Sequence, residues 1–355
     1  MQADRKSQIN WITVAKGLGI LLVVLGHSFR DNMLTSNVIC GFVYHFIYSF
    51  HMFFWFTLSG ITFGLSCKKY FNTPGQYLAK RTKTQLVPFL SYATLIYLCF
   101  TVACFVPSIR NALENADYKI YGFGEYWLQI LRYDNPYSVH LWYLLVLFIL
   151  SVFCFFWLKA FSYKAMAKGV LAILFLIGYV LEPYLEVPYA VHRLLTYGIF
   201  FVFGFLIASK EDNKVIVPRV PIWLTVLGWG YICVLSVDLA YKNLTAFPHA
   251  TPLQKLFLLV SLFPVIISLI NLSKRLTDNK FFAKLGTISY PVYLLHQPFC
   301  AGFAGVVLYQ VLGLPIIVVV AVCIALSFAV PMFILWVVRS LKPLGKLADL
   351  LFSIR

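Results

Sequence analysis

Charged residues are scarce in this chain, and acidic ones are the scarcest. Only 12% of the 355 residues are charged, with 13 Asp and Glu against 29 Lys and Arg. Apolar residues make up 61% of the sequence and aromatic residues 18%. A soluble domain of this length could not bury so much apolar surface, so the composition excludes that class. It predicts an all-α, polytopic integral membrane protein.

Motifs that would indicate other functions are also missing. The eight cysteines form no Cys-x-x-Cys pair and say nothing secure about the redox compartment. There is no His-Glu-x-x-His motif, and we expect no metal site. No repeat, low-complexity linker or soluble domain is visible, so residues 1–355 are predicted to form a single membrane domain. The net charge of +16 does not indicate nucleic acid, because the basic residues form short clusters between apolar runs.

Ten apolar segments are long enough to span a bilayer. Ten crossings place both termini on one side, and most Lys and Arg fall on that side, whereas most acidic residues fall on the other. The charge asymmetry therefore predicts cytoplasmic termini. The segments lie at roughly 10–29, 40–66, 85–107, 138–158, 168–182, 190–209, 220–240, 254–272, 285–309 and 312–338.

The first segment carries two polar residues that are costly in a membrane. Lys16 lies near its cytoplasmic end and His27 near its external end. The helical rise puts them on the order of 16 Å apart. Taken alone, the pair could be a lysine that reaches the headgroups and a histidine that ends the helix.

Further histidines enter the predicted spans. His45 and His51 lie in the second segment, His140 opens the fourth, His192 opens the sixth and His296 lies in the ninth. A single histidine in a membrane helix usually bonds to a neighbouring group. Several together favour a polar cavity in the membrane domain.

The ninth segment, LGTISYPVYLLHQPF, has a polar stripe. Ser289, Tyr293 and His296 follow at spacings of four and three, which places them on one helical face. Pro291 and Pro298 predict a bend, which is common where a helix lines a cavity.

The longest external connection, at about 107–137, interleaves aromatic residues with Glu125, Arg132 and Asp134. We expect a short amphipathic helix at the membrane interface there. It could be an aromatic anchor. It could also be a platform on which a sugar ring stacks while the carboxylates bind its hydroxyls.

A basic cluster, Lys80, Arg81 and Lys83, stands directly before Pro88 and the third span. One interpretation is ordinary positive-inside charge. The other is a phosphate-binding site, because guanidinium and ammonium groups pair with phosphate oxygens.

These motifs together resemble the membrane acyltransferase-3 family. They are a cation eleven positions before His27, FHMFFWFTLSG at 50–60, KRTKTQLVP at 80–88, HLWYL at 140–144 and LGTISYPVYLLH at 285–296. The arrangement is most similar to the branch of fucose 4-O-acetylase-like sugar O-acetyltransferases.

The resemblance implies a multi-pass enzyme of the bacterial inner membrane that takes an acetyl group from cytoplasmic acetyl-CoA. The acceptor would be a hydroxyl of a surface polysaccharide or lipid-linked sugar at the external face. His27 matches the essential histidine, Lys16 the basic residue before it, and Arg81 the first arginine of an Arg-x-x-Arg motif. The second arginine is Thr84 here, and Thr13 replaces an aspartate that often pairs with the lysine.

The remaining roles are expectations. Lys16, Arg81 and Lys83 would hold acyl-CoA, whose pantetheine arm, on the order of 15–20 Å, matches the helical rise from Lys16 to His27. His27 would act as base. Support or oxyanion stabilisation would come from His51, Ser289, Tyr293 and His296, and acceptor binding from His140, Trp142, Glu125 and Asp134. A transporter or flippase for a small solute or polyprenol-linked sugar is the alternative, because transporters also carry intramembrane charges.

Overall fold

The computed structural model describes residues 2–115, 122–132, 139–208, 215–245 and 251–340. Within these ranges the regular structure is helical, and the only strand-like pairing is an isolated bridge between Ala208 and Val215. Ten helical spans are long and apolar enough to cross a membrane. The predictions of an all-α polytopic membrane protein and of ten spans are thus confirmed, whereas the cytoplasmic placement of the termini stays a prediction.

The spans fall where the apolar segments predict them, except that the third begins at Pro74 rather than at about 85, so the basic cluster lies within this span and not before it. They are α1 (Gln2–His27), α3 (Val38–Tyr48) with α4 (His51–Ser66), α5 (Pro74–Arg81) with α6 (Val87–Ala103), α9 (Trp142–Ala160), α10 (Ala165–Leu181), α11 (Tyr189–Ile207), α12 (Ile222–Tyr241), α13 (Pro252–Arg275), α14 (Lys280–Leu295) with α15 (Ala304–Val306), and α16 (Ile316–Ser340). Short helices α2 (Asp31–Ser36), α7 (Pro107–Asn115) and α8 (Phe123–Arg132) connect them.

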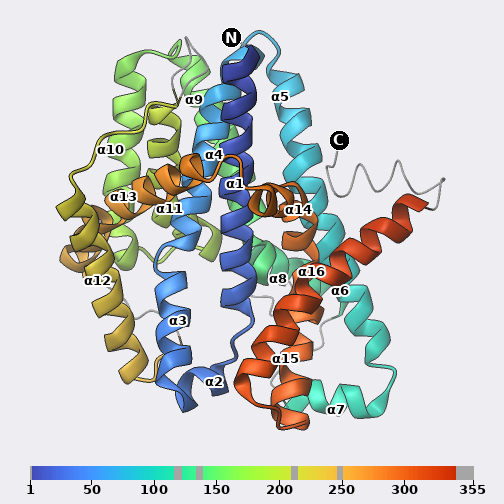
Figure 1. Cartoon of the computed structure of the whole chain (residues 1–355). Helices are drawn as coiled ribbons and strands as arrows, with labels where there is room; N and C mark the ends of the chain where they lie inside the picture. The colour runs from blue at the N-terminus through green and yellow to red at the C-terminus, as the bar shows by residue number, and fades with distance from the viewer. Residues whose placement is uncertain (1, 116–121, 133–138, 209–214, 246–250, 341–355) are drawn as a thin grey trace.

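Helix α1 runs through the middle of the bundle (Figure 1) and packs closely on α14. A Cβ on Gly17 would lie 2.0 Å from the carbonyl oxygen of Phe282, and one on Gly286 would lie 1.8 Å from that of Thr13. Only glycine permits this approach of two backbones, which is a common way for membrane helices to associate.

The contact between Gly17 and Gly286 also determines how far along the bundle two histidines lie. His27 follows Gly17 by ten residues, and His296 follows Gly286 by ten. Because both chains rise by the same length from one contact point, the two histidines reach the same end of the bundle.

The second span is broken, although the sequence predicts one continuous segment at 40–66. Helix α3 ends at Tyr48 and α4 begins at His51, with Phe50 outside helical geometry at φ −137° and ψ −23°. The Ser49 hydroxyl donates to the carbonyl of His45 at 2.7 Å, next to the break. Side chains that bond backbone carbonyls in this way often bend helices. His45 and His51 therefore belong to different helices.

The ninth span is interrupted next to Pro298, as predicted, whereas α14 continues through Pro291. Helix α14 ends at Leu295, and the chain continues as a π-helical segment, η5 (His296–Phe303), with Gln297 at φ −121° and ψ 152°. Pro298 has no N–H to donate, and the residue before a proline avoids helical geometry. His296 thus sits at the exact point where the regular helix stops.

The connection between the third and fourth spans forms α7 and α8, which confirms the predicted short helix there. Tyr126 of α8 is buried, its ring centroid lies 4.2 Å from that of Tyr97 on α6, and its hydroxyl donates to the carbonyl of Ala93. Glu125 is exposed. Tyr126 anchors α8 on α6, so at least part of this segment serves packing.

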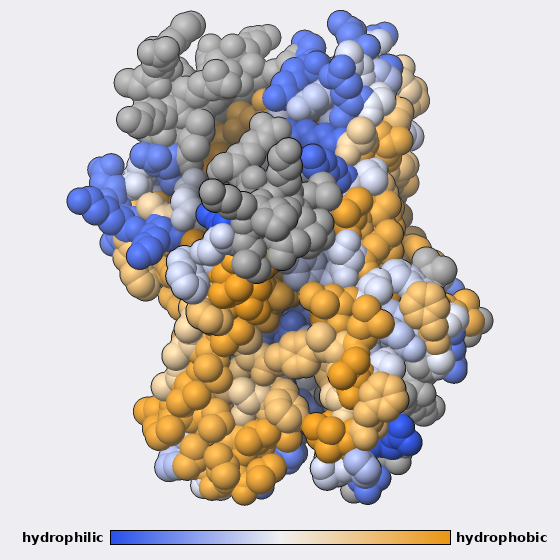
Figure 2. Space-filling view, turned by 90° about the vertical axis from the view of Figure 1, so that its right-hand side faces the viewer, coloured by the Kyte–Doolittle hydropathy of each residue, from blue (hydrophilic) through white to orange (hydrophobic). Residues whose placement is uncertain are grey.

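Figure 2 shows one lateral face of the molecule, with hydrophobic residues over much of its area and hydrophilic ones gathered toward its ends. Large apolar side chains on the outside include Phe105, Val226 and Ile317, which are 77%, 64% and 80% exposed. Such a surface suits lipid. The lower half of the face in Figure 2 is hollowed, with hydrophilic residues at the bottom of the hollow.

Candidate active site

Four histidines from separate parts of the chain meet at one end of the bundle: His27, His51, His140 and His296. The ring centroid of His296 lies 5.1 Å from that of His27 and 5.5 Å from that of His140. Tyr48 links His27 to His51, with ring centroids 5.9 and 4.8 Å away. Apart from the half-buried His27, these histidines are buried. We call this group the histidine cluster.

Backbone carbonyls fix the tautomer of two members. His296 Nδ1 lies 2.8 Å from the carbonyl oxygen of Tyr293 and 3.1 Å from that of Val292. Because carbonyls only accept, Nδ1 carries the proton and Nε2 is a lone-pair acceptor. His296 Nε2 is buried and has no hydrogen-bond partner among the described residues. His51 Nδ1 likewise donates to the carbonyl of Ile47, at 2.9 Å.

His27 is held from two sides. Its Nδ1 lies 3.2 Å from the Tyr48 hydroxyl. Its carbonyl accepts from Arg30 Nη2 at 2.8 Å and from Gln297 Nε2 at 3.5 Å. Arg30 also donates to the carbonyl of Ala301, so it ties the end of α1 to η5. Arg30 and Tyr48 were not among the predicted site residues, although Arg30 follows His27 by only three residues.

The polar residues of α14 make bonds of their own. The Tyr293 hydroxyl donates to the carbonyl of His140 at 2.7 Å, and His140 Nε2 lies 3.4 Å from the carbonyl of Leu294. The Ser289 hydroxyl donates to the carbonyl of Gly286 at 2.8 Å. The structure thus brings Tyr293 to the cluster, but the hydroxyl protons of Tyr293 and Ser289 both point at backbone carbonyls.

Three aromatic side chains, Trp142, Tyr189 and Tyr197, group with Arg193, and we call this group the aromatic basin. Trp142 follows His140 by only two residues. Trp142 stacks on Tyr197 with ring centroids 5.2 Å apart, and the Arg193 guanidinium lies 5.1 Å from the Trp142 ring and 4.6 Å from that of Tyr189. The sequence signalled only that Arg193 follows a histidine at the start of a span. Of the predicted acceptor-binding residues, Glu125 lies exposed on α8, and Asp134 lies outside the described residues.

Two other histidines make different contacts. His45 Nε2 bonds with the carbonyl of Leu244 at 2.8 Å. His192 Nδ1 lies 2.7 Å from Glu182, which also pairs with Lys255. This network joins α11 and α13 to the short turn η4 (Glu182–Tyr184) that follows α10, which explains His192 as a packing residue.

Lys16 and His27 lie on one face of α1, because eleven residues make three helical turns plus about 20°. Between them, Gly19 packs on the Trp55 ring. The ring centroid of Tyr143 lies 6.3 Å from that of Trp55 and 5.8 Å from that of Tyr293. The Tyr143 hydroxyl is hydrogen-bonded to the Ser59 hydroxyl at 2.6 Å. Trp55 Nε1 is buried and has no partner in the described parts of the chain. We call Trp55, Tyr143 and Tyr293 the aromatic column.

The opposite end of the bundle carries the predicted cations. Arg81 is half-buried, its guanidinium lies 5.0 Å from the Tyr77 ring, and its Nε has no partner in the ranges that the structure describes. Lys83 is exposed. Lys68 and Lys168 face the Tyr163 ring at 5.8 and 4.0 Å. Neither lysine stood out in the sequence beyond its charge.

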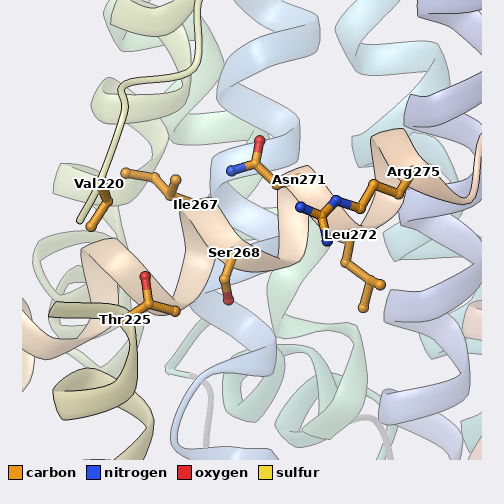
Figure 3. Close-up of a pocket in the computed structure, with 7 residues that line it drawn as sticks. All are labelled: Val220, Thr225, Ile267, Ser268, Asn271, Leu272 and Arg275. Atoms are coloured by element: carbon orange, nitrogen blue, oxygen red, sulfur yellow. The ribbon is translucent and has the colours of Figure 1, made fainter. Parts of the chain in front are cut away.

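A pocket of about 190 Å³ lies elsewhere, between α12 and α13 (Figure 3). It is not lined by any member of the histidine cluster. The described residues contain no group of three or more His, Cys, Asp or Glu side chains placed to hold a metal ion. The expectation that the enzyme needs no metal stays a prediction.

Comparison with known families gives one match. The model of an acyltransferase domain, that of the acyltransferase-3 family, matches residues 9–336. Searches of curated proteins and of solved structures gave no match. The matched stretch contains all ten membrane spans except the C-terminal end of the last. With its ten spans and its histidine cluster, this chain belongs to the membrane acyltransferase-3 family.

Proposed function

We propose that this protein transfers an acetyl group from cytoplasmic acetyl-CoA to a carbohydrate hydroxyl at the external face of a bacterial inner membrane. The observation that carries the proposal is the arrangement along α1. Lys16 lies eleven residues before His27 on the same face of α1, and His27 belongs to the histidine cluster, in a member of an acyltransferase family. Family membership also favours group transfer over the transporter alternative.

His27 is the base in this scheme. When its Nδ1 donates to the Tyr48 oxygen, Nε2 is free to take the proton from the acceptor hydroxyl. The acceptor oxygen then bonds to the thioester carbon, the carbon–sulfur bond breaks, and the proton passes from His27 to the departing thiolate. Atoms balance as alcohol plus thioester giving ester plus thiol.

The oxyanion of the tetrahedral intermediate needs a donor. Ser289 and Tyr293 direct their hydroxyl protons to backbone carbonyls, and neutral His51 and His296 present acceptors. An imidazolium is a donor at both nitrogens. We therefore assign the oxyanion contact to the His27 imidazolium, whose Nε2 carries the proton taken from the acceptor hydroxyl before that proton passes to the thiolate.

The acyl-CoA nucleotide binds at the opposite end. Arg81, Lys83 and Lys16 pair with its phosphates, and Lys68 and Lys168 extend the same basic surface. Its pantetheine arm follows the aromatic column, where the unpartnered Trp55 Nε1 offers a donor to an amide carbonyl of the arm.

Arg81→Ala is expected to raise the apparent KM for acetyl-CoA by roughly 10–100-fold with a smaller change in kcat, because a charge-assisted phosphate contact is lost. Lys159→Ala is the control, since Lys159 is a cation of the same side outside this group. Steady-state kinetics with purified enzyme measure both. An unchanged KM in Arg81→Ala would assign the basic cluster to topology alone.

The acceptor binds on the aromatic basin of Trp142, Tyr189 and Tyr197 with Arg193. Sugar rings stack on flat aromatic faces, and the basin adjoins the histidine cluster because Trp142 follows His140 by only two residues. The hollow in the lower half of the face in Figure 2 is at the same end of the bundle and offers a route of entry. His140 and Glu125 remain candidates for binding sugar hydroxyls.

Sidedness tests the proposal. In right-side-out vesicles, acetyl-CoA trapped inside is expected to support acetylation of a glycan added outside, whereas acetyl-CoA added outside with the same glycan is not. Radiolabel in the glycan measures transfer. Transfer only when both substrates share one face would contradict the transmembrane scheme.

A labelling control fixes the orientation. In a background without native cysteines, Asn32→Cys should react with an impermeant maleimide from outside, and Asn72→Cys should not. Both positions are exposed. The reverse pattern would invert the orientation and every binding role assigned from it.

A further inference from the structure

The pocket between α12 and α13, here called the α12–α13 pocket, exists because the two helices touch and then separate. A Cβ on Gly228 would lie 2.6 Å from the carbonyl oxygen of Ser261, so the backbones are in contact there. Helix α13 is steeply inclined to the rest of the bundle (Figure 1), and the pocket lies beside its C-terminal part. The lining residues are Val220, Thr225, Ile267, Ser268, Asn271, Leu272 and Arg275.

The α12–α13 pocket lies at a membrane boundary. Lys274, next to Arg275, has its ammonium 5.4 Å from the ring of Trp11, near the start of the apolar span of α1. The pocket is therefore level with the leaflet on the N-terminal side. Its surroundings on α12 are apolar and outward-facing, with Ile222 81% and Trp223 59% exposed. Lipid, rather than another helix of this chain, faces this surface.

The polar groups of the pocket are mainly donors. In Figure 3 the Arg275 guanidinium extends back along α13 toward Asn271, and Thr225 lies across from them on α12. The Ser268 hydroxyl already donates to the carbonyl of Val265 at 2.7 Å and accepts from Trp229 at 3.1 Å. In the described ranges no carboxylate forms an ion pair with Arg275. A guanidinium beside an amide and a hydroxyl matches the oxygens of a phosphate.

We propose that the α12–α13 pocket binds the phosphate of an anionic phospholipid in the leaflet on the N-terminal side. Arg275, Asn271 and Thr225 donate to the headgroup, and the acyl chains lie along the outward apolar residues of α12 and on Leu272. Charge complementarity selects an anionic lipid, and the apolar surroundings select a lipid over a soluble phosphate. This site is separate from the proposed acetyl transfer.

The test is native mass spectrometry of the full-length protein with phosphatidylglycerol, phosphatidylcholine of the same chains, and soluble glycerol phosphate. The wild type is expected to retain phosphatidylglycerol in preference to phosphatidylcholine. Arg275→Gln should weaken that retention about tenfold or more, since one charge-assisted contact is lost. Arg339→Gln, at an exposed arginine in the last turn of α16, is the matched control and should keep it.

Each outcome decides the proposal. An equal loss in Arg275→Gln and Arg339→Gln would reduce the effect to general surface charge and overturn it. Binding of glycerol phosphate at the same concentrations would identify the ligand as a soluble phosphate and would overturn the assignment of a lipid. If Arg275→Gln does not fold, the pair Asn271→Leu and Thr225→Val removes neutral donors instead. Undiminished lipid preference in that double variant contradicts the site.

Discussion

Replacing His27 by alanine is expected to lower acetyl transfer by about 10²–10⁴-fold while the protein still folds, because a positioned base contributes about that much. His27 is half-buried, and the bonds that tie its end of α1 to η5 use its backbone carbonyl rather than its ring. The ring itself contacts Tyr48 and His296. Alanine therefore removes the imidazole and leaves the backbone anchors. Turnover of radiolabelled acetyl-CoA with purified enzyme measures the loss.

His45→Gln is the matched control. His45 is also a buried histidine of the membrane domain, but its ring bonds to the carbonyl of Leu244, and a glutamine amide can replace that donor. We expect activity within about threefold of wild type for this variant. Turnover above a third of the wild-type value in His27→Ala would exclude the base role.

Gly286→Ala is expected to cause a large loss of stability for the addition of a single methyl group. The new Cβ would lie 1.8 Å from the carbonyl oxygen of Thr13, and neither backbone can yield without separating α1 from α14. Overpacking costs about 1–3 kcal/mol where side chains can adjust, and here only backbone can. We expect a clearly lower unfolding temperature in detergent, together with lost transfer, because the separation also parts His27 from His296.

Gly230→Ala is the control for the effect of a glycine-to-alanine change within a helix where no close contact is made. Gly230 lies within α12, and a Cβ there meets nothing within 4 Å. The same substitution should leave the unfolding temperature equal or slightly higher, since alanine favours helix over glycine. Equal losses in the two variants would show that glycine at 286 serves no close contact.

The ten spans could be predicted because hydropathy is a property of consecutive residues. The bend at Gln297 was also predictable, because proline acts on its own neighbours. The break at Phe50 was not, since it lies within an apolar run that contains no proline.

The candidate site was likewise predictable from the sequence only in part. Spacing placed Ser289, Tyr293 and His296 on one face, but it could not tell which carbonyls their polar atoms would reach. The meeting of His27 with His140 and His296 joins residues over a hundred positions apart. Arg30 and Tyr48 gain meaning only through that packing, so a single sequence offered no reason to select them.

The glycine contact between α1 and α14 also has a consequence for substrate choice. Because the two backbones are in close contact at Gly17 and Gly286, His296 cannot slide relative to Lys16 and His27 on α1. In the proposed scheme the distance from Lys16 to the histidine cluster is therefore fixed, and the acyl donor has to match it. We expect a thioester on a carrier shorter than pantetheine, anchored by the same phosphates, to stop short of His27, whatever its chemical reactivity.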